Sequence, residues 1–113
     1  MEIKFADKKL EKYANDDKLS VRKQGSKRAE LYKIRLDDMY AAETYDDLRN
    51  LPGRYHELKN QRKGQWACDL DHPYRLIFTP QERPIPADKN GKFIWIEITS
   101  VEIIEITDYH KEG

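Results

Sequence analysis

The chain has 113 residues, a length typical of one domain, and the sequence predicts a single domain over residues 1–113. Its 21 Lys and Arg balance 21 Asp and Glu, so the net charge of zero argues against a strongly nucleic-acid-binding protein as a whole. Cys68 is the only cysteine, which excludes an intrachain disulfide and a two-cysteine metal site. No run of about 18 apolar residues and no secretory pattern occurs, so we expect a soluble cytoplasmic protein with no membrane partner.

The charges are unevenly distributed along the chain. Residues 1–36 hold eleven Lys or Arg against six Asp or Glu, and residues 37–53 hold five acids against Arg49 alone. The segment 54–64 is basic again and contains, beside a single acid, Arg54, Lys59, Arg62 and Lys63. Because salt screens charges over roughly 8 Å, a local basic patch can bind phosphate even in a neutral chain.

The chain begins with a short predicted strand and a broken helix. Residues 2–5 alternate polar and apolar side chains, as a strand does, and Asp7 is suited to cap a following helix. The helical spacing of apolar residues is interrupted at residues 15–17 and then resumes as far as Gly25. We therefore expect two helical segments separated by a break.

A longer helix and a short one are predicted next. Ser26 is suited to cap the longer helix, whose apolar residues at three- and four-residue steps form one stripe that should face the core. This stripe consists of Ala29, Tyr32, Leu36, Met39 and Tyr40. Thr44 with Asp47 resembles a capping box and predicts a short helix over residues 45–50.

Strand patterns dominate the second half of the chain. Residues 55–59, 65–70 and 74–79 alternate apolar and polar side chains or are rich in strand-forming residues. A proline-rich loop over residues 80–92 follows, and residues 93–99 are predicted to form a further strand before the last one. One strand, then helices, then an antiparallel meander predicts an α+β domain with the helices on one face of a small sheet.

The final strand, residues 101–107, runs into three polar residues that can carry acid-base chemistry. Its apolar alternation changes phase between Ile103 and Ile104, which predicts a β-bulge. Beyond the bulge, a regular strand would place Asp108 and His110 on one face and Tyr109 on the other. An acid and an imidazole would then project together from the strand end.

Other candidate groups lie on the neighbouring strands. His56 lies between basic residues on the first strand of the meander, and Arg75 lies in an otherwise apolar strand, which suggests that Arg75 faces an anion. His72 lies in a turn and is expected to be a surface residue. The spacings typical of zinc sites and of serine hydrolases are missing, so neither class is favoured and no metal or cofactor is expected.

Imidazoles, an acid and nearby cations favour cleavage of RNA through its own 2′-hydroxyl. In this chemistry a base removes the hydroxyl proton, a cation stabilises the charge on the phosphorane, and an acid protonates the leaving 5′-oxygen. The protein supplies no nucleophile and needs no metal.

Four blocks of sequence together resemble a known family. These blocks are Leu51–Lys59, Arg62–Trp66, Tyr74–Phe78 and Glu105–His110. In their combined spacing they resemble the HigB-like toxins of type II toxin-antitoxin systems, within the RelE/ParE superfamily. The resemblance implies a RelE-like small antiparallel sheet with N-terminal helices packed on one face, which agrees with the elements predicted above.

The resemblance also implies roles for individual residues. His56 is similar to the histidine in the family's first meander strand, and Asp108, Tyr109 and His110 are similar to its C-terminal catalytic residues. The histidines would transfer protons, Asp108 would orient a histidine, and Tyr109 would position a base. Which histidine is the base stays open. The implied phosphate- and RNA-binding residues are Lys59, Arg75, Arg54, Arg62 and Lys63.

The implied function is that of a ribosome-dependent mRNA endoribonuclease that inhibits translation. Its implied partners are the ribosome, mRNA and a HigA-like helix-turn-helix antitoxin, with operator DNA bound only through the antitoxin complex. Two alternatives stay open: a ParE-like gyrase inhibitor without enzymatic activity, and a decayed toxin that only binds its antitoxin and co-represses the operon. The acid-base residues at the chain end argue against the gyrase inhibitor.

Overall fold

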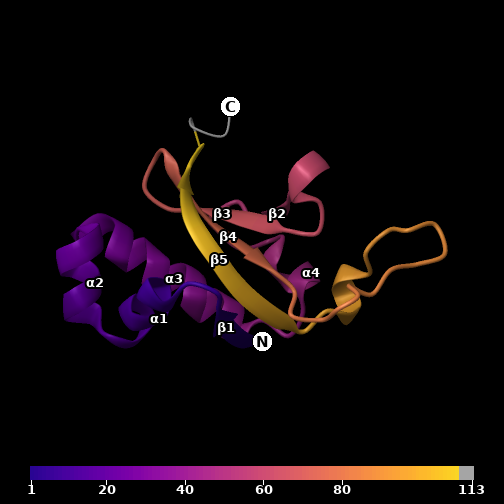
Figure 1. The fold of residues 1–113 in the computed structure, drawn as a ribbon, viewed down its shortest axis with the longest axis horizontal. Helices are drawn as coiled ribbons and strands as arrows, with labels where there is room; N and C mark the ends of the chain where they lie inside the picture. The colour runs from indigo at the N-terminus through magenta and orange to yellow at the C-terminus, as the bar shows by residue number, and fades with distance from the viewer. Residues whose placement is uncertain (110–113) are drawn as a thin grey trace.

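The computed structural model describes residues 1–109, whose strands form a five-stranded mixed sheet (Figure 1). The strand order across the sheet is β1-β5-β4-β3-β2. β1 lies parallel to β5, and all other neighbours are antiparallel. The strands are β1 (Glu2–Phe5), β2 (His56–Glu57), β3 (Trp66–Asp69), β4 (Tyr74–Thr79) and β5 (Ser100–Asp108). The predicted α+β class is confirmed, with β1 as the parallel exception to the expected antiparallel sheet.

Four helices precede the meander, and α1, α2 and α3 gather beside one side of the sheet (Figure 1). They are α1 (Lys8–Asn15), α2 (Asp17–Gln24), α3 (Ser26–Ala41) and α4 (Tyr45–Leu48). The predicted break is real, because Asp16 ends α1 and its carboxylate accepts the Leu19 N–H at the start of α2. Asp7 caps α1 as expected, accepting the Lys9 N–H at 2.7 Å.

Some element boundaries differ from the expectation. Ser26 is the first residue of α3, and Gly25, at φ +84°, occupies the cap position predicted for Ser26. The carboxylate of Asp47 accepts the Thr44 N–H as the capping pattern predicts, but α4 ends at Leu48. β2 has only two residues because the chain adopts positive φ on both sides of it, at Arg54 and at Asn60.

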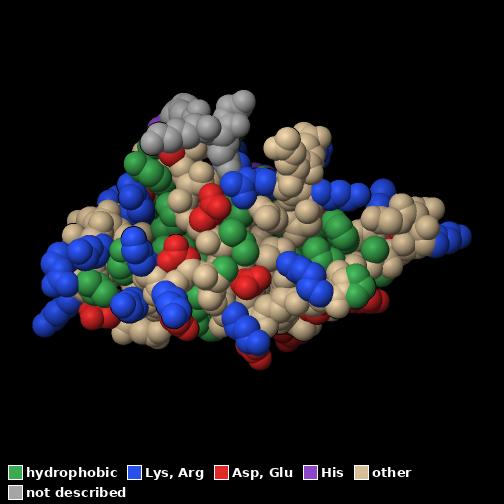
Figure 2. Space-filling model, in the orientation of Figure 1, with side chains coloured by type: hydrophobic (Ala, Val, Ile, Leu, Met, Phe, Trp, Pro, Cys, Tyr) green, Lys and Arg blue, Asp and Glu red, His purple; other side chains and the backbone are tan. Residues whose placement is uncertain are grey.

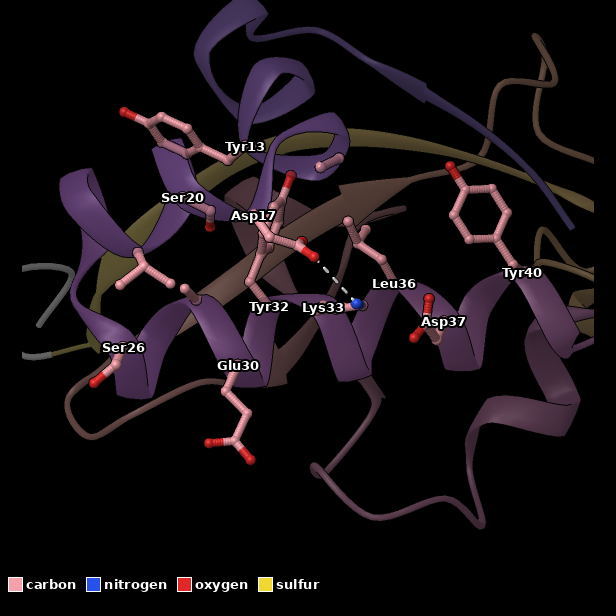
Figure 3. A pocket seen from close by; sticks show the side chains of 13 residues that line it. Tyr13, Asp17, Ser20, Ser26, Glu30, Tyr32, Lys33, Leu36, Asp37 and Tyr40 are labelled. Atoms are coloured by element: carbon pink, nitrogen blue, oxygen red, sulfur yellow. Dashed lines mark hydrogen bonds and ion pairs between the residues drawn. The ribbon is translucent and has the colours of Figure 1, made fainter.

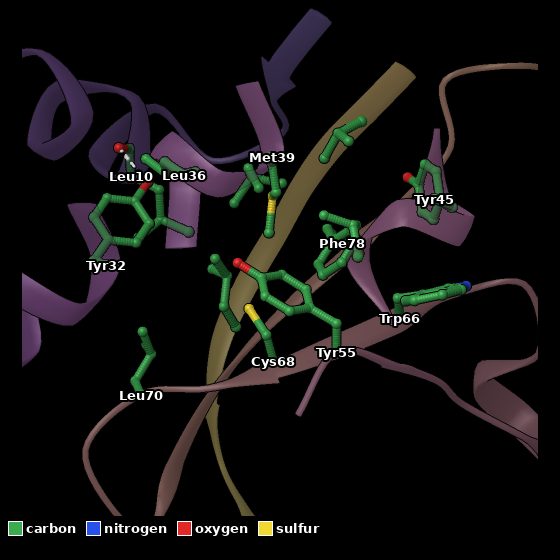
Figure 4. Close-up of a cluster of buried hydrophobic side chains, with 14 of the residues drawn as sticks. Leu10, Tyr32, Leu36, Met39, Tyr45, Tyr55, Trp66, Cys68, Leu70 and Phe78 are labelled. Atoms are coloured by element: carbon green, nitrogen blue, oxygen red, sulfur yellow. Dashed lines mark hydrogen bonds between the residues drawn. The ribbon is translucent and has the colours of Figure 1, made fainter. Parts of the chain in front are cut away.

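Buried aliphatic and aromatic side chains fill the core between the helices and the sheet (Figure 4). The Tyr45 ring lies 5.3 Å from the rings of both Trp66 and Trp95, measured between ring centres. Such pairs contribute about 0.5–1.5 kcal/mol each beyond the burial of their area. The stripe predicted on α3 faces this core, except Tyr40, which is exposed.

The strand predicted over residues 93–99 is wrong. Phe93 pairs only with Ala87 in an isolated bridge, and a 3₁₀-helix, η2 (Trp95–Glu97), follows. The turn of η2 lets the Trp95 side chain reach Tyr45 and Trp66 in the core, which a straight strand in the sheet would not do. Burial of this one side chain therefore overrides the strand preference of the segment.

The predicted β-bulge in the last strand is confirmed. Ile77 of β4 lies opposite Glu105, whereas the next residue, Phe78, lies opposite Ile103, so Ile104 has no partner residue on β4. One extra residue in β5 reverses the faces of everything that follows it. Val101 and Ile103 are thus fully buried toward the helices, while Glu105 lies on the face of Ile77.

Candidate functional site

The face of the sheet opposite the helices carries most of the predicted site residues. Successive residues of β4 point to opposite faces, and Arg75 lies on the face away from the core residue Leu76. Asp69 of β3 and Thr107 of β5 lie directly opposite Arg75 on either side. His56 of β2 shares this face through its pairing with Ala67, which lies opposite Ile77. We call this surface the open face.

Arg75 is at the centre of the open face and is only 9% exposed. Its guanidinium carbon lies 5.0 Å from the centre of the Tyr109 ring, a cation–π contact. Burial lowers the pKa of Arg75, and the positive charges of Arg62 and Arg54 lower this pKa further. Arg62 and Arg54 therefore each lie close enough to Arg75 to repel its charge, which favours an anion bound beside Arg75.

Arg54 is held in place by Asp69. The Arg54 Nε donates to Asp69 Oδ2 at 2.7 Å, and Nη2 donates to Oδ1 at 3.3 Å. This hydrogen bonding raises the pKa of Arg54. The turn before it depends on Gly53, at φ +108°, whose carbonyl accepts the Asp69 N–H at 2.7 Å. The Pro-Gly-Arg motif thus fixes Arg54 against β3.

Arg62 is fixed from the other side of the open face. It belongs to the 3₁₀-helix η1 (Asn60–Arg62) and donates to Gln65 Oε1 at 2.8 Å and to Glu105 Oε1 at 3.3 Å. Arg62, Lys59 and Arg75 together line a cavity of about 430 Å³. Lys63, the fifth predicted cation, lies on the other side of η1 and does not line this cavity.

A second cavity, of about 320 Å³, lies at the end of β5. Arg54, Asp69, Arg75 and Tyr109 line it together with His72. His72 is exposed, as expected of a surface residue, but its place beside the cavity was not predicted. Arg75 lines both cavities and therefore connects them.

His56 has a defined tautomer. Its Nδ1 lies 2.5 Å from the Arg54 carbonyl oxygen, which can only accept, so Nδ1 carries the hydrogen. In the neutral ring Nε2 then holds the lone pair and can act as a base. His56 is half-buried, lies two strands from Arg75, and does not line either cavity among the residues that the structure describes.

Asp108 and Tyr109 lie on opposite faces of β5, as predicted, but Tyr109 and not Asp108 is on the face of Arg75. Asp108 lies opposite Tyr74, so Asp108 is on the face away from Arg75, and Tyr109 instead joins Arg75. The expectation that Asp108 faces the cationic site is wrong, because Thr107 lies opposite Arg75 and regular alternation along β5 then puts Asp108 on the other face, with Ile106. His110, the remaining predicted residue, lies outside the described residues.

Two acids of the open face were missed by the sequence analysis. Asp69 binds Arg54 and Glu105 binds Arg62, so both acids position predicted cations. The sequence did contain a signal for Asp69. Trp66 and Cys68 of β3 face the core, so alternation puts Asp69 on the opposite face, where it lies beside Arg75. The signal for Glu105 was present as well, since alternation beyond the predicted bulge places Glu105 on the face opposite Ile106.

A further cavity, of about 240 Å³, lies among α1, α2 and α3 and has a different character (Figure 3). Apolar and aromatic side chains line it, and its acids are Asp17, Glu30 and Asp37. Lys33 is the cation at its wall and pairs with Asp17 at 3.3 Å. An acidic wall disfavours phosphate binding, so the open face is the better candidate for an anionic ligand.

Residues 1–109 offer neither a metal site nor a membrane-spanning helix. Within them no group of three or more His, Cys, Asp or Glu side chains is arranged to hold a metal ion. None of the helices in this part of the chain is long and apolar enough to cross a membrane.

Comparison with known proteins agrees with the resemblance. A family model described as the RelE-like toxin of the type II toxin-antitoxin system HigB matches residues 3–87. The curated Toxin HigB-1 of Vibrio cholerae serotype O1 is 35% identical over 79 residues, which cover 69% of this chain and 82% of that toxin.

A solved structure supports the fold. A chain of the YoeB-YefM complex from Staphylococcus aureus superposes with a TM-score of 0.56 at 16% identity, covering 95% of this chain and 94% of that one. At this identity the similarity establishes the fold alone, whereas the two sequence matches establish the family. The chain is therefore a member of the HigB family of RelE-like toxins from type II toxin-antitoxin systems.

Proposed function

We propose that this toxin, acting as one domain over residues 1–113, cleaves mRNA on the ribosome by metal-independent acid-base chemistry and so inhibits translation. The observation that carries the proposal is the convergence of Arg54, Arg62 and Arg75 on one open face, with the Tyr109 ring against Arg75. A phosphate at Arg75 relieves the repulsion that Arg62 and Arg54 exert on it, and the aromatic ring beside Arg75 suits an unpaired base.

The proposed reaction uses the RNA's own hydroxyl as nucleophile. A base removes the 2′-hydroxyl proton, the 2′-oxygen attacks the adjacent phosphorus, and the bond from phosphorus to the 5′-oxygen breaks. An acid protonates that oxygen, so the products are a 2′,3′-cyclic phosphate and a 5′-hydroxyl end. The buried Arg75 stabilises the charge that develops on the phosphorane, where the low local dielectric strengthens its effect.

We assign proton transfer to His56 and His110. His56 is supported by its tautomer, which leaves Nε2 able to accept a proton. His110 is assigned from its position directly after Tyr109 and from the family resemblance. Substrate therefore has to lie across β3 and β4 for His56 and Arg75 to act on one phosphate.

Lys59, Arg62, Arg54 and Lys63 are proposed to bind the RNA backbone, because phosphate contacts fix the position of a strand without reading its sequence. The ribosome would present the mRNA, which places the activity in the cytoplasm. A cognate antitoxin, proposed to be a HigA-like helix-turn-helix protein, would neutralise the toxin and carry the complex to operator DNA. The YoeB-YefM assembly supports a stable protein partner.

The test is inducible expression of the wild type, Arg75→Ala and His110→Ala in bacteria, with growth curves and mapping of new mRNA 5′ ends. The wild type is expected to stop growth and to produce cuts in translated mRNA. Arg75→Ala is expected to reduce cleavage about 10²–10³-fold, the cost of removing one transition-state donor. Arg22→Ala, an exposed cation on α2, is the matched control and should cleave like the wild type.

Other outcomes would replace the proposal. Equal arrest and equal cutting by the wild type and Arg75→Ala would refute the role of Arg75. Arrest with DNA-damage signalling and no mRNA cuts would indicate a gyrase inhibitor. A chain without effect on growth that still binds its antitoxin would be a decayed toxin that only represses.

A further inference from the structure

A second basic groove lies at the β2 edge of the sheet. It is separated by η1 from the cavity that Arg62 and Arg75 line. It has a volume of about 570 Å³ and is formed by η1, the 80–92 loop and the residues that follow this loop. We call it the Phe93 groove after the aromatic residue in its wall. Figure 2 shows Lys and Arg side chains around a hydrophobic area between η1 and the 80–92 loop.

The Phe93 groove has an excess of positive charge. Lys59, Lys63 and Lys92 line it, and none of their side chains forms an ion pair within residues 1–109. Its acid, Glu57, is already engaged: it accepts the Trp95 Nε1–H at 3.1 Å and pairs with Arg49 at 3.6 Å. The three lysines therefore remain available for phosphate groups.

The aromatic residue of the groove is fixed and half-buried. The Phe93 ring contacts Trp95 edge to face, with ring centres 5.4 Å apart, and Lys63 Nζ lies 5.8 Å from the Phe93 ring centre. A tight turn holds the segment: Asp88 accepts the N–H groups of Asn90 and Lys92, and Gly91 adopts φ +83°. A fixed ring flanked by lysines is the arrangement that binds single-stranded nucleic acid by stacking and phosphate contacts.

The Phe93 groove is continuous with the open face. Leu58, Lys59 and Asn60 line both this groove and the cavity that contains Arg62 and Arg75. A strand held at Arg75 can therefore pass Lys59 and enter the groove without leaving the basic surface. Lys92 and Phe93 lie beyond residue 87, where the match to the family model ends.

We propose that the Phe93 groove binds a stretch of single-stranded RNA that continues from the strand cleaved at the open face. Lys63 and Lys92 bind its phosphates, and Phe93 stacks with a base. The inference rests on the proposed RNA cleavage for the direction of the strand. The groove's own affinity for RNA can be measured independently of cleavage.

The test is fluorescence anisotropy with labelled single-stranded RNA of about 4 and about 16 nucleotides, lengths that span the usual site sizes of such grooves. The purified proteins are the wild type, Phe93→Leu, the double variant Lys63→Ala/Lys92→Ala, and the control Lys8→Ala/Lys9→Ala on α1. Circular dichroism establishes that each variant is folded.

The two groove variants are expected to fail in different ways. The double lysine variant should weaken binding of the longer RNA and reduce its log–log salt slope by about 1.4, since each lost phosphate contact in single strands contributes about 0.7. Phe93→Leu should weaken the same binding about 5–150-fold, the equivalent of one lost stack of about 1–3 kcal/mol, at an unchanged salt slope. The shorter RNA and the control should bind as before.

The possible contrary results distinguish a failure of the groove proposal from a failure of the proposed nuclease. Equal binding of the longer RNA by the wild type and both groove variants, or no binding of it at all, overturns the proposal, as does displacement of RNA by an oligoglutamate peptide at equal concentration. Loss of cleavage in Arg75→Ala with unaltered groove variants would leave the nuclease standing without the groove. RNA binding in the groove without any mRNA cleavage in cells would support the groove and refute the proposed nuclease.

Discussion

The guanidinium of Arg75 lies against the ring of Tyr109, 5.0 Å from its centre. This contact joins a buried cation of β4 to the end of β5, and it places an aromatic face at the cavity where the proposed substrate phosphate binds. The ring, rather than the hydroxyl, is the part of Tyr109 that the contact uses.

Two substitutions of Tyr109 distinguish the role of its ring from that of its hydroxyl. Tyr109→Phe keeps the ring and should retain mRNA cleavage close to that of the wild type. Tyr109→Leu removes the cation–π contact, about 0.5–2 kcal/mol, and should reduce cleavage about 2–30-fold. Primer extension on an induced transcript measures both. Equal loss in the two variants would mean that the phenol hydroxyl takes part in proton transfer.

Asp108 is expected to matter less than the family resemblance implies. Its position opposite Tyr74 puts it on the other face from Arg75, so Asp108→Asn should reduce cleavage less than about tenfold, against about 10²–10³-fold for Arg75→Ala. The comparison uses cleavage rates at matched protein levels. A loss in Asp108→Asn as large as that in Arg75→Ala would show that Asp108 reaches the substrate.

Gly53→Ala should destabilise the fold and disturb Arg54. A Cβ at Gly53, where φ is +108°, would lie 2.6 Å from both Cζ and Nε of Arg35. Arg35 Nε donates to the Asp69 carbonyl at 2.7 Å, so moving Arg35 breaks that bond as well. We expect a loss of about 1–3 kcal/mol in the free energy of unfolding, measured by urea denaturation.

The control for this substitution is Gly25→Ala. Gly25 also has a positive φ, +84°, but nothing lies within 4 Å of an added Cβ. The Gly25→Ala variant therefore has the backbone strain without the clash, and it should lower the free energy of unfolding less than Gly53→Ala does. Equal losses at the two positions would assign the whole effect to the backbone.

Acid should weaken the attachment of the 80–92 loop through Glu82. Burial alone would raise the pKa of Glu82, but hydrogen bonds from the Ser100 hydroxyl and the Thr99 N–H outweigh burial and lower it below the ordinary value of 4.5. A lowered folded-state pKa means that this stabilisation is complete above pH 4.5 and is lost as the pH falls through the folded-state value.

Chemical denaturation between pH 7 and pH 3 measures this dependence. Glu82→Gln should be less stable than the wild type at neutral pH and should lose less stability on acidification. Ser100→Ala, which removes one donor, should show part of the same change. If both variants follow the wild-type curve in parallel, Glu82 is not the group responsible.

Periodicity identified most of the elements because most of them are paired or packed along their whole length. It failed at residues 93–99, where the apolar residues serve the core through Trp95 alone and the segment turns to deliver it. Periodicity also predicted too long a strand at β2. Arg54 and Asn60 adopt positive φ and so limit this strand, and the sequence does not indicate positive φ at residues other than glycine.

The candidate site was predicted in its residue types and misjudged in one orientation. Alternation along β4 placed Arg75 on the open face, and the phase change in β5 located the bulge. The sides of Asp108 and Tyr109 follow from the pairing of Thr107 with Arg75, and no local pattern encodes this register between β4 and β5. The zero net charge was equally uninformative, because the cations that matter are gathered by the fold.

The single unpaired residue at Ile104 divides β5 into two lengths that should respond differently to mutation. Before it, Val101 and Ile103 are fully buried, so substitutions there should lower the amount of folded protein in the cell. After it, Glu105 and Tyr109 contact the cations of the open face, so substitutions that break these contacts should reduce toxicity while the protein still accumulates. A library of β5 variants selected for survival and sorted by protein abundance would separate into two populations, with the boundary at Ile104.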